Sequence, residues 1–349
     1  MKTAKIGLLG FGNVGGGTYH ILTENKEIIE KRVGVTPEVV KILQRNRNKK
    51  RFTDVDFSLL TEDPDDIIKN PDIDIVVEMI GGTEPATSFM VQAMNNGKHV
   101  VSANKAAIAK SYRLLTETAR KNNVEFLFEA SVAGGIPVLT ALTGPLQANK
   151  FVEVTGILNG TTNYILTKMS EEGLSYEEVL KDAQAKGFAE ADPTADVEGI
   201  DAANKLSILI ALAFGKYISP ESIPTVGITG ITSADIEAAK SSGKKIKLLG
   251  KASLRDGMVE YMVAPAFLDE DHPLAGVNNE FNAVYVTGDM VGELMFYGRG
   301  AGPLPTGSAI CGDIINIMKT KIKEGVVCFG SVKNAQLLRS FYQQLCLWE

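Results

Sequence analysis

The sequence predicts an α/β fold in which a doubly wound parallel sheet is followed by a second, α+β domain. Through about residue 135, short apolar runs alternate with helical patterns, as expected when helices connect parallel strands. A glycine-rich turn follows the first of these runs and is typical of nucleotide-binding sheets. After residue 137 strand-like stretches follow one another more closely, which indicates a largely antiparallel second sheet.

Length and composition exclude several classes of protein. The chain has 349 residues, enough for two domains. Its net charge of -6 argues against a nucleic-acid or anionic-membrane partner, and no apolar run approaches the roughly 18 residues that span a bilayer. The three cysteines lack CxxC spacing, so we expect a reducing, cytoplasmic location rather than a disulfide framework.

The first domain, residues 1–135, is expected to alternate strands and helices in chain order. The expected strands are 4–9, 39–43, 74–80, 99–102 and 124–128, and the expected helices are 14–29, 84–96 and 111–122. The run 74–80 is almost continuously apolar, as in a strand covered on both faces. Gly97 is a suitable residue to end the helix before it.

The second domain, residues 136–304, is expected to mix helices with an antiparallel sheet. The expected helices are 137–147, 161–170, 193–213 and 232–245, and the expected strands are 152–158, 245–252, 258–265 and 282–287. Residues 305–349 are expected to begin with a helix that packs back on the first domain. The absence of a low-complexity linker favours two domains that share a cleft.

A GxGxxG sequence predicts a dinucleotide site of the Rossmann-like kind. Its residues are Gly10, Phe11, Gly12, Asn13, Val14 and Gly15. The sequence follows a predicted strand and opens a predicted helix, the context in which a pyrophosphate rests on free helix N–H groups. A glycine-rich turn without a ligand is the alternative, and the surrounding alternation of strands and helices argues against it.

The end of the second predicted strand favours NADP(H) over NAD(H). Sites specific for NAD commonly carry Asp or Glu there to bind the ribose hydroxyls, whereas this chain reads Leu43-Gln44-Arg45-Asn46. A basic run follows: Arg45, Arg47, Lys49, Lys50 and Arg51. Guanidinium and ammonium groups suit a 2′-phosphate. A solvated charged turn is the alternative, and NAD(H) remains possible.

Asp201 and Lys205 lie four residues apart on a helix that continues into the apolar run 206–213. Asp192 before Pro193 has the form of an N-cap followed by proline in the first turn, so we expect one helix from Pro193 onward. An exposed Asp–Lys pair at this spacing would be unremarkable. A pair that leads into a buried segment instead indicates a cleft, because buried charges need a partner or a role.

Four further segments resemble the homoserine dehydrogenase family, and the resemblance runs from the N-terminus to about residue 320. They are residues 100–106, 128–137, 156–164 and, most specific, 187–205. The resemblance implies the reversible NAD(P)H-dependent reduction of L-aspartate 4-semialdehyde to L-homoserine, a step of threonine and methionine biosynthesis. It implies a small-molecule substrate.

The resemblance also implies roles for individual residues. Lys205 is the expected proton donor and acceptor, with Asp201 orienting it, and Lys105 is expected to polarise the carbonyl beside the cofactor. Glu190 and Asp196 are the expected partners of the substrate ammonium. Ser102 and the late glycine loop with Gly302 are expected near the nicotinamide; a plain turn is the alternative for the loop.

A monovalent cation and a dimer follow from the same resemblance. Glu129 and the carbonyls of Val132, Gly134 and Ile136 match a site that is usually occupied by sodium, and a homodimer is expected through the sheet of the second domain. Many family members carry a C-terminal ACT domain. We expect none here, and residues 324–349 do not resemble the family.

Two rival functions remain open at this point. One is another amino-acid dehydrogenase of the same architecture, against which the segment 190–205 argues. The other is a non-catalytic NAD(P)-binding redox sensor, since a fold alone does not establish function. A sensor would not need two lysines and several acids in one cleft.

Overall fold

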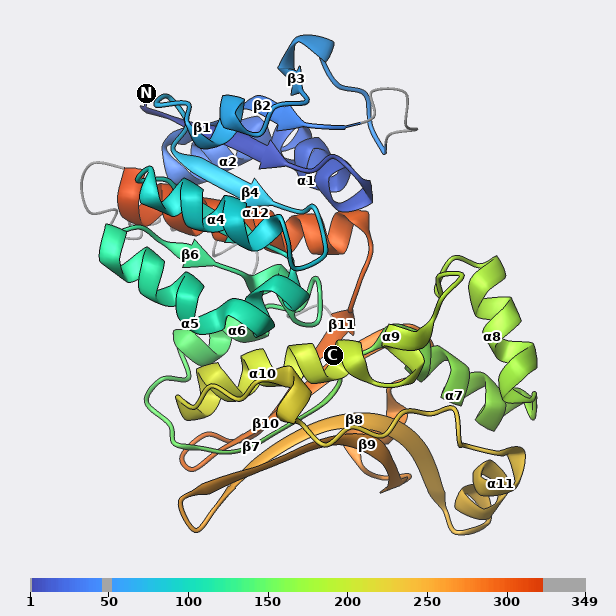
Figure 1. The fold of residues 1–349 in the computed structure, drawn as a ribbon. Helices are drawn as coiled ribbons and strands as arrows, with labels where there is room; N and C mark the ends of the chain where they lie inside the picture. The colour runs from blue at the N-terminus through green and yellow to red at the C-terminus, as the bar shows by residue number, and fades with distance from the viewer. Residues whose placement is uncertain (1, 46–51, 323–349) are drawn as a thin grey trace, which may run out of the picture.

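The computed structural model describes residues 2–45 and 52–322 and contains two sheets (Figure 1). The first sheet has six parallel strands in the order β3-β2-β1-β4-β5-β6. These are β1 (Lys2–Leu9), β2 (Val35–Leu43), β3 (Leu60–Thr61), β4 (Ile75–Glu78), β5 (His99–Ser102) and β6 (Phe126–Leu127). The strand order reverses between β1 and β4, which is where open parallel sheets bind their ligands. The predicted doubly wound sheet is confirmed.

The helices of this part are α1 (Asn13–Glu24), α2 (Lys26–Val33), α3 (Asp65–Ile68), α4 (Ala86–Asn95) and α5 (Lys105–Asn122). The expected single helix 14–29 is wrong, because the backbone leaves helical geometry at Asn25 and a second helix starts after it. The expected start of the helix at residue 111 is also wrong. The Asn104 side chain caps the helix at Lys105, and Ser111 is only a kink within it.

The second sheet has five antiparallel strands in the order β11-β10-β7-β8-β9. These are β7 (Phe151–Ile157), β8 (Lys244–Arg255), β9 (Met258–Asp269), β10 (Phe281–Gly288) and β11 (Gly292–Arg299). The antiparallel second sheet is therefore confirmed. The sequence did not predict β11, which is joined to β10 by a short turn and pairs with it over its full length.

The remaining helices are α6 (Val138–Thr143), α7 (Gly160–Glu172), α8 (Tyr176–Ala185), α9 (Thr194–Val197), α10 (Ile200–Phe214), α11 (Ser233–Ser241) and α12 (Pro303–Ile317). The expected single helix 193–213 is wrong. Gly199 has a φ of +81° and separates α9 from α10, and a Cβ there would lie 2.9 Å from the Thr225 side chain. The expected helix 232–245 is too long, since β8 already begins at Lys244.

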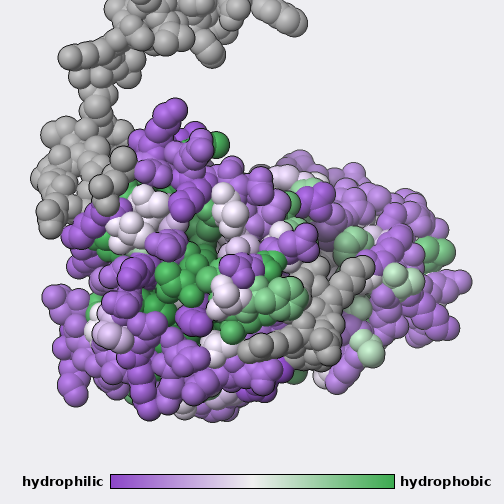
Figure 2. Space-filling model, turned by 90° about the horizontal axis from the view of Figure 1, so that it is seen from above, coloured by the Kyte–Doolittle hydropathy of each residue, from purple (hydrophilic) through white to green (hydrophobic). Residues whose placement is uncertain are grey.

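Helices cover one face of the second sheet and leave much of the other open (Figure 1). α12 follows β11 and then returns to the first sheet, where it packs along α1. The approach is close: a Cβ on Gly17 of α1 would lie 2.1 Å from the carbonyl oxygen of Pro303. Ile310 and Ile314 of α12 join the core of the first sheet. Figure 2 shows a largely hydrophilic surface on the face seen from above, with hydrophobic residues gathered toward its middle.

Tyr217, just after α10, contacts helix α5 and so links the second part of the molecule to the first. Its ring stacks on Tyr112 with ring centroids 5.8 Å apart, and its hydroxyl donates to the Ala109 carbonyl at 2.9 Å. This contact holds the first half of α5 against the region that carries α10. Within residues 2–45 and 52–322 no helix is long and apolar enough to cross a bilayer.

Candidate active site

The three positions of the GxGxxG turn require glycine for different structural reasons. Gly10 has a φ of +110°, and a Cβ there would lie 2.8 Å from the Met79 carbonyl oxygen. A Cβ on Gly15 would lie 2.3 Å from the carbonyl oxygen of Gly10. A Cβ on Gly12 would meet no atom of the described residues within 4 Å. The fold therefore explains Gly10 and Gly15, whereas the open space at Gly12 fits the close approach of a pyrophosphate.

The start of α1 is suited to bind an anion. No side chain among residues 2–45 and 52–322 caps it, so its first N–H groups have no such partner at the positive end of the helix dipole. Asn13 is exposed and Val14 half-buried at this end. Phe11 is buried and packs edge-on against Tyr19 at 5.8 Å.

Two predicted cofactor residues flank this turn. Gly302, with a φ of +121°, directly precedes α12, whose first residue contacts α1 at Gly17. Arg45 is exposed just beyond β2. The other predicted basic residues, Arg47, Lys49, Lys50 and Arg51, lie outside the described residues.

A buried carboxylate that the sequence analysis did not single out ties the ends of β4 and β5 together. Glu78 is fully buried and accepts hydrogen bonds from the Ser102 hydroxyl at 2.7 Å and the Ile80 N–H at 2.8 Å. Asn104, which caps α5 just before Lys105, donates to it at 3.3 Å. Burial raises the pKa of Glu78. The hydroxyl of Ser102, a predicted cofactor-binding residue, is therefore bonded to Glu78 at the edge of the sheet. The feature of the sequence that could have identified Glu78 is the presence of an acid within the otherwise apolar run 74–80.

Asp201 and the two predicted lysines form the centre of the candidate site. Lys205 Nζ donates to Asp201 Oδ2 at 2.7 Å and to the Leu158 carbonyl at 2.6 Å. Lys105 Nζ lies 3.0 Å from Asp201 Oδ1, an ion pair whose geometry falls short of a hydrogen bond. Asp201 and Lys205 are 6% and 7% exposed, whereas the Lys105 side chain is 45% exposed. One buried carboxylate therefore joins α5 to α10.

The surroundings drive the pKa values of the two lysines in opposite directions. Burial lowers the pKa of Lys205 and outweighs the nearby charge of Asp201. The charge of Asp201 raises the pKa of Lys105 against a smaller effect of burial. Burial also works to raise the pKa of Asp201, but the two ammonium groups and two hydrogen bonds hold that pKa well below its ordinary value. Lys205 is thus the lysine that loses a proton more easily.

Asp196 and Glu190 complete the predicted cluster. Asp196 is half-buried and accepts a hydrogen bond from Asn159 Nδ2 at 2.7 Å, and burial raises its pKa. Glu190 is exposed. The charges of both acids add to the rise in the pKa of Lys105, so both face the same centre. Asn159, which the sequence analysis left without a role, lies within this cluster.

The predicted cation residues lie in one turn. Glu129 is buried, and its two carboxylate oxygens accept the N–H groups of Leu139 at 2.8 Å and Thr140 at 2.6 Å at the start of α6. Val132 is extended, Gly134 has a φ of +55°, and the Ile136 carbonyl accepts the Val138 N–H. No group of three His, Cys, Asp or Glu side chains able to hold a metal occurs in the part of the chain that the structure describes.

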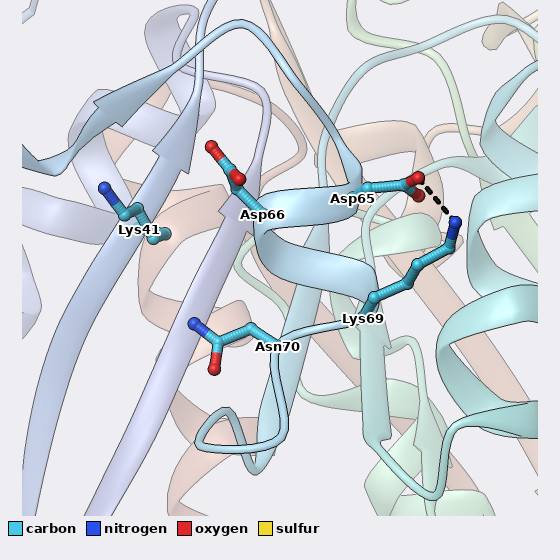
Figure 3. A pocket seen from close by; sticks show the side chains of 5 residues that line it. All are labelled: Lys41, Asp65, Asp66, Lys69 and Asn70. Atoms are coloured by element: carbon cyan, nitrogen blue, oxygen red, sulfur yellow. Dashed lines mark ion pairs between the residues drawn. The ribbon is translucent and has the colours of Figure 1, made fainter.

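A separate hollow of about 330 Å³ lies beside β2 and α3 (Figure 3). Its lining residues are Lys41, Asp65, Asp66, Lys69 and Asn70. Asp65 and Lys69 point toward one another and form an ion pair at 2.7 Å. None of the predicted site residues that the structure describes lines this hollow.

Comparisons with known proteins match both parts of the chain. Residues 10–129 match the family model "Homoserine dehydrogenase, NAD binding domain", and residues 137–315 match the model "Homoserine dehydrogenase". The Bacillus subtilis homoserine dehydrogenase is 45% identical over 319 residues, which cover 91% of this chain and 74% of that protein. The Pseudomonas aeruginosa enzyme is also 45% identical, with 91% and 73% covered.

Solved structures agree with the sequence matches. A homoserine dehydrogenase from Thiobacillus denitrificans has a TM-score of 0.87 and 45% identity, covering 91% of this chain and 74% of that one. A hyperthermophilic archaeal homoserine dehydrogenase, solved in complex with NADPH, has a TM-score of 0.74 and 26% identity, covering 90% and 97%. This chain belongs to the homoserine dehydrogenase family of NAD(P)-dependent oxidoreductases.

Proposed function

We propose that Lys205 exchanges the proton in the interconversion of L-aspartate 4-semialdehyde and L-homoserine. The observation that carries the proposal is the buried Lys205–Asp201 contact at 2.7 Å, in a setting where burial lowers the pKa of the lysine. As an ammonium, Lys205 donates a proton to the carbonyl oxygen during reduction. As a neutral amine, it accepts the hydroxyl proton in the reverse direction. Asp201 orients Lys205 and favours its charged form.

Lys105 has the complementary role of a permanent charge. Its pKa is raised by Asp201, so it stays protonated, and its half-exposed position suits contact with a substrate. A fixed ammonium near the carbonyl oxygen stabilises the negative charge that develops there during reduction. We assign Lys105 to the carbonyl and to the side of the site that faces the cofactor.

We assign the ammonium group of the substrate to two acids and its carboxylate to the start of a helix. Glu190 and Asp196 are the acceptors for the ammonium group. The N–H groups of Gly160 and Thr161, at the start of α7, have no acceptor among the described residues, and helix starts favour carboxylates. Leu158, whose carbonyl binds Lys205, lies two residues before α7, so this helix start adjoins the reacting groups.

We assign the pyrophosphate of the cofactor to the turn Gly10–Gly15 and to the start of α1. The bound nicotinamide cofactor supplies the hydride in reduction and takes it up in the reverse reaction. NADP(H) is the proposed preference over NAD(H), because Arg45 follows β2 where an NAD site places an acid. Ser102 and Gly302 are proposed to border the nicotinamide.

A sodium ion is the proposed ligand of Glu129 and the carbonyls of Val132, Gly134 and Ile136. The donors are all oxygen, as hard cations prefer. Burial raises the pKa of the neighbouring Asp313 to about 7; the Glu129 N–H, which donates to Asp313 at 2.8 Å, works to lower it, and the Glu129 charge adds a smaller rise. A higher melting temperature in NaCl than in tetramethylammonium chloride, lost in Glu129→Ala, is the expected result.

We further propose the domain limits 1–135, 136–304 and 305–349, and a homodimer formed through the second sheet. The return of α12 to α1 supports placing residues 305–322 with the first domain, while residues 323–349 lie outside the described part of the chain. The open face of the second sheet supports the dimer. The cytoplasmic location stays a prediction.

The first test follows nicotinamide absorbance with L-aspartate 4-semialdehyde, using NADPH and NADH separately. Wild-type protein is expected to oxidise NADPH faster than NADH. Lys205→Ala is expected to lose about 100- to 10 000-fold in kcat, the usual contribution of a general acid, while NADPH binding measured by fluorescence is unchanged. A Lys205→Ala variant with wild-type kcat would remove Lys205 from the reaction.

A further inference from the structure

We propose that Asn159 is a positioning residue whose side-chain amide fixes Asp201 and Asp196, so that Asp201 presents one oxygen to each lysine. Asn159 lies between β7 and α7 and is 5% exposed. The inference rests on the roles proposed above for Asp201 and Lys205, and it assigns a further residue to the same reaction.

The orientation of the Asn159 amide follows from its contacts. Its Oδ1 accepts the Thr162 N–H at 2.9 Å and so caps α7. Its Nδ2 must then face the opposite way, where it donates to Asp196 Oδ1 at 2.7 Å and to Asp201 Oδ2 at 2.9 Å. A flipped amide would bring its oxygen against two carboxylates and its nitrogen against an N–H donor. The helix cap therefore points both amide hydrogens at the two acids.

These hydrogen bonds determine how Asp201 serves two lysines. Oδ2 accepts from both Asn159 and Lys205, which leaves Oδ1 for the ion pair with Lys105. Without the Asn159 donor, the carboxylate would be free to turn about its Cβ–Cγ bond and to give both oxygens to one lysine.

Asn159 also holds two like charges together. Asp196 on α9 and Asp201 on α10 repel one another, and the charge of Asp201 works to raise the pKa of Asp196. The shared amide donates one hydrogen to each and lies between them. The other charged groups that face this point are Lys205 on α10, Lys105 on α5 and Glu190 ahead of α9. The balance of these charges sets how readily Lys205 gives up its proton.

Substitutions at Asn159 separate positioning from capping. Asn159→Ser keeps a side-chain oxygen, which is a good helix cap, but loses the amide donors. We expect its melting temperature to fall no further than that of a helix-cap variant outside the site, and its kcat to fall by ~10- to 100-fold, as for a lost hydrogen bond to a charged group. The dissociation constant for NADPH should not change.

The pH profile tests whether the side chain at position 159 lies close enough to Lys205 to change its pKa. Asn159→Asp also keeps a capping oxygen, but it adds a negative charge beside Asp201 and Lys205. That charge favours protonated Lys205, so the rise of homoserine oxidation with pH should shift to higher pH than in the wild type.

Thr232→Ala is the matched control, because Thr232 caps α11 by accepting the Asp235 N–H and lies outside the site. It should lower the melting temperature and leave kcat and the pH profile unchanged. Asn159→Ser with wild-type kcat would overturn the inference. So would a loss of kcat in Asn159→Ser that disappears at an assay temperature low enough to keep the variant folded. The proposed function is tested separately, because it would be contradicted by a Lys205→Ala variant that keeps wild-type activity.

Discussion

At the scale of single residues, the candidate site depends on one carboxylate shared by two lysines in unlike surroundings. Lys205 is enclosed, and burial lowers its pKa. Lys105 is half-exposed, and the same Asp201 raises its pKa. Groups whose environments separate their pKa values in this way divide between proton transfer and fixed charge. The pH dependence of the reaction therefore reports on each of these neighbours.

Homoserine oxidation is expected to speed up as pH rises, because Lys205 must be neutral to accept a proton, and the rise should come below the ordinary lysine pKa of 10.5. Asp201→Asn removes a charge that raises the pKa of Lys205, so the rise should move to lower pH. Lys105→Met removes a charge that lowers it, so the rise should move to higher pH. Initial rates of both variants, measured across the pH range against the wild type, test this.

The opposite signs of these shifts are the informative feature. Both substitutions should slow the reaction, so a loss of rate alone would not identify the titrating group. If both variants shifted the profile in the same direction, the titrating group would not be Lys205. A profile that is unchanged in Asp201→Asn would also remove Lys205 as the proton acceptor.

Sequence reasoning identified the lysines and acids of the candidate site but not the residues that hold them in position. Asp201 and Lys205 were found because four-residue spacing places them on one helix face, and the ion pair confirms that they meet. Glu78 and Asn159 were missed as parts of the site. Their partners lie far away in the sequence, such as Ser102 for Glu78 and Asp201 for Asn159, and hydrophobic periodicity contains no information on such contacts.

At the scale of elements, the β1–α1 turn separates glycines needed by the fold from a glycine needed by a ligand. Gly12→Ala adds a methyl group to open space at an unstrained φ of -82°. We expect little change in the free energy of unfolding but a higher KM for NADPH. Gly15→Ala places a methyl group against the Gly10 carbonyl and should cost roughly 1–3 kcal/mol, as overpacking usually does.

Urea unfolding and NADPH titration of both variants measure the two effects. Gly230→Ala is a control, since a Cβ there also meets no described atom within 4 Å and the residue lies outside the turn. It should change neither quantity. If Gly12→Ala bound NADPH as tightly as the wild type, the assignment of the pyrophosphate to this turn would be wrong.

The helix limits show where local patterns stop being sufficient. Asn25 and Gly199 each divide a stretch that apolar spacing had predicted as one helix. At Gly199 the reason is tertiary, since Thr225 and Val263 approach the backbone too closely for a side chain. β11 was missed although its residues alternate in exposure, because such a strand is defined mainly by its pairing with β10.

At the scale of the whole molecule, the second sheet has one face inside and one face outside. Val284 and Val286 of β10 are buried against the helices. The opposite face carries Met262, Met295 and Tyr297, which are 47%, 42% and 52% exposed. The strand register places these residues on the same face as Tyr285. Helices α7 and α10 contact the inner face, so the proposed active site and this outer face, which also carries Glu153, Lys251 and Glu293, lie on opposite sides of the sheet.

The exposed apolar side chains on this face fit the proposed homodimer, since a second copy would cover them about a two-fold axis and could pair with the charged residues among them. Met295→Glu would then bury a charge at two symmetry-related places, and the dimer should dissociate into single chains. Met290→Glu is the control, because Met290 is 82% exposed in the turn beyond the strand pairing and should leave the dimer intact. Light scattering at micromolar concentration measures the mass of each protein. A wild-type mass of one chain, or a Met295→Glu variant that remains at two, would show that this face is not the interface.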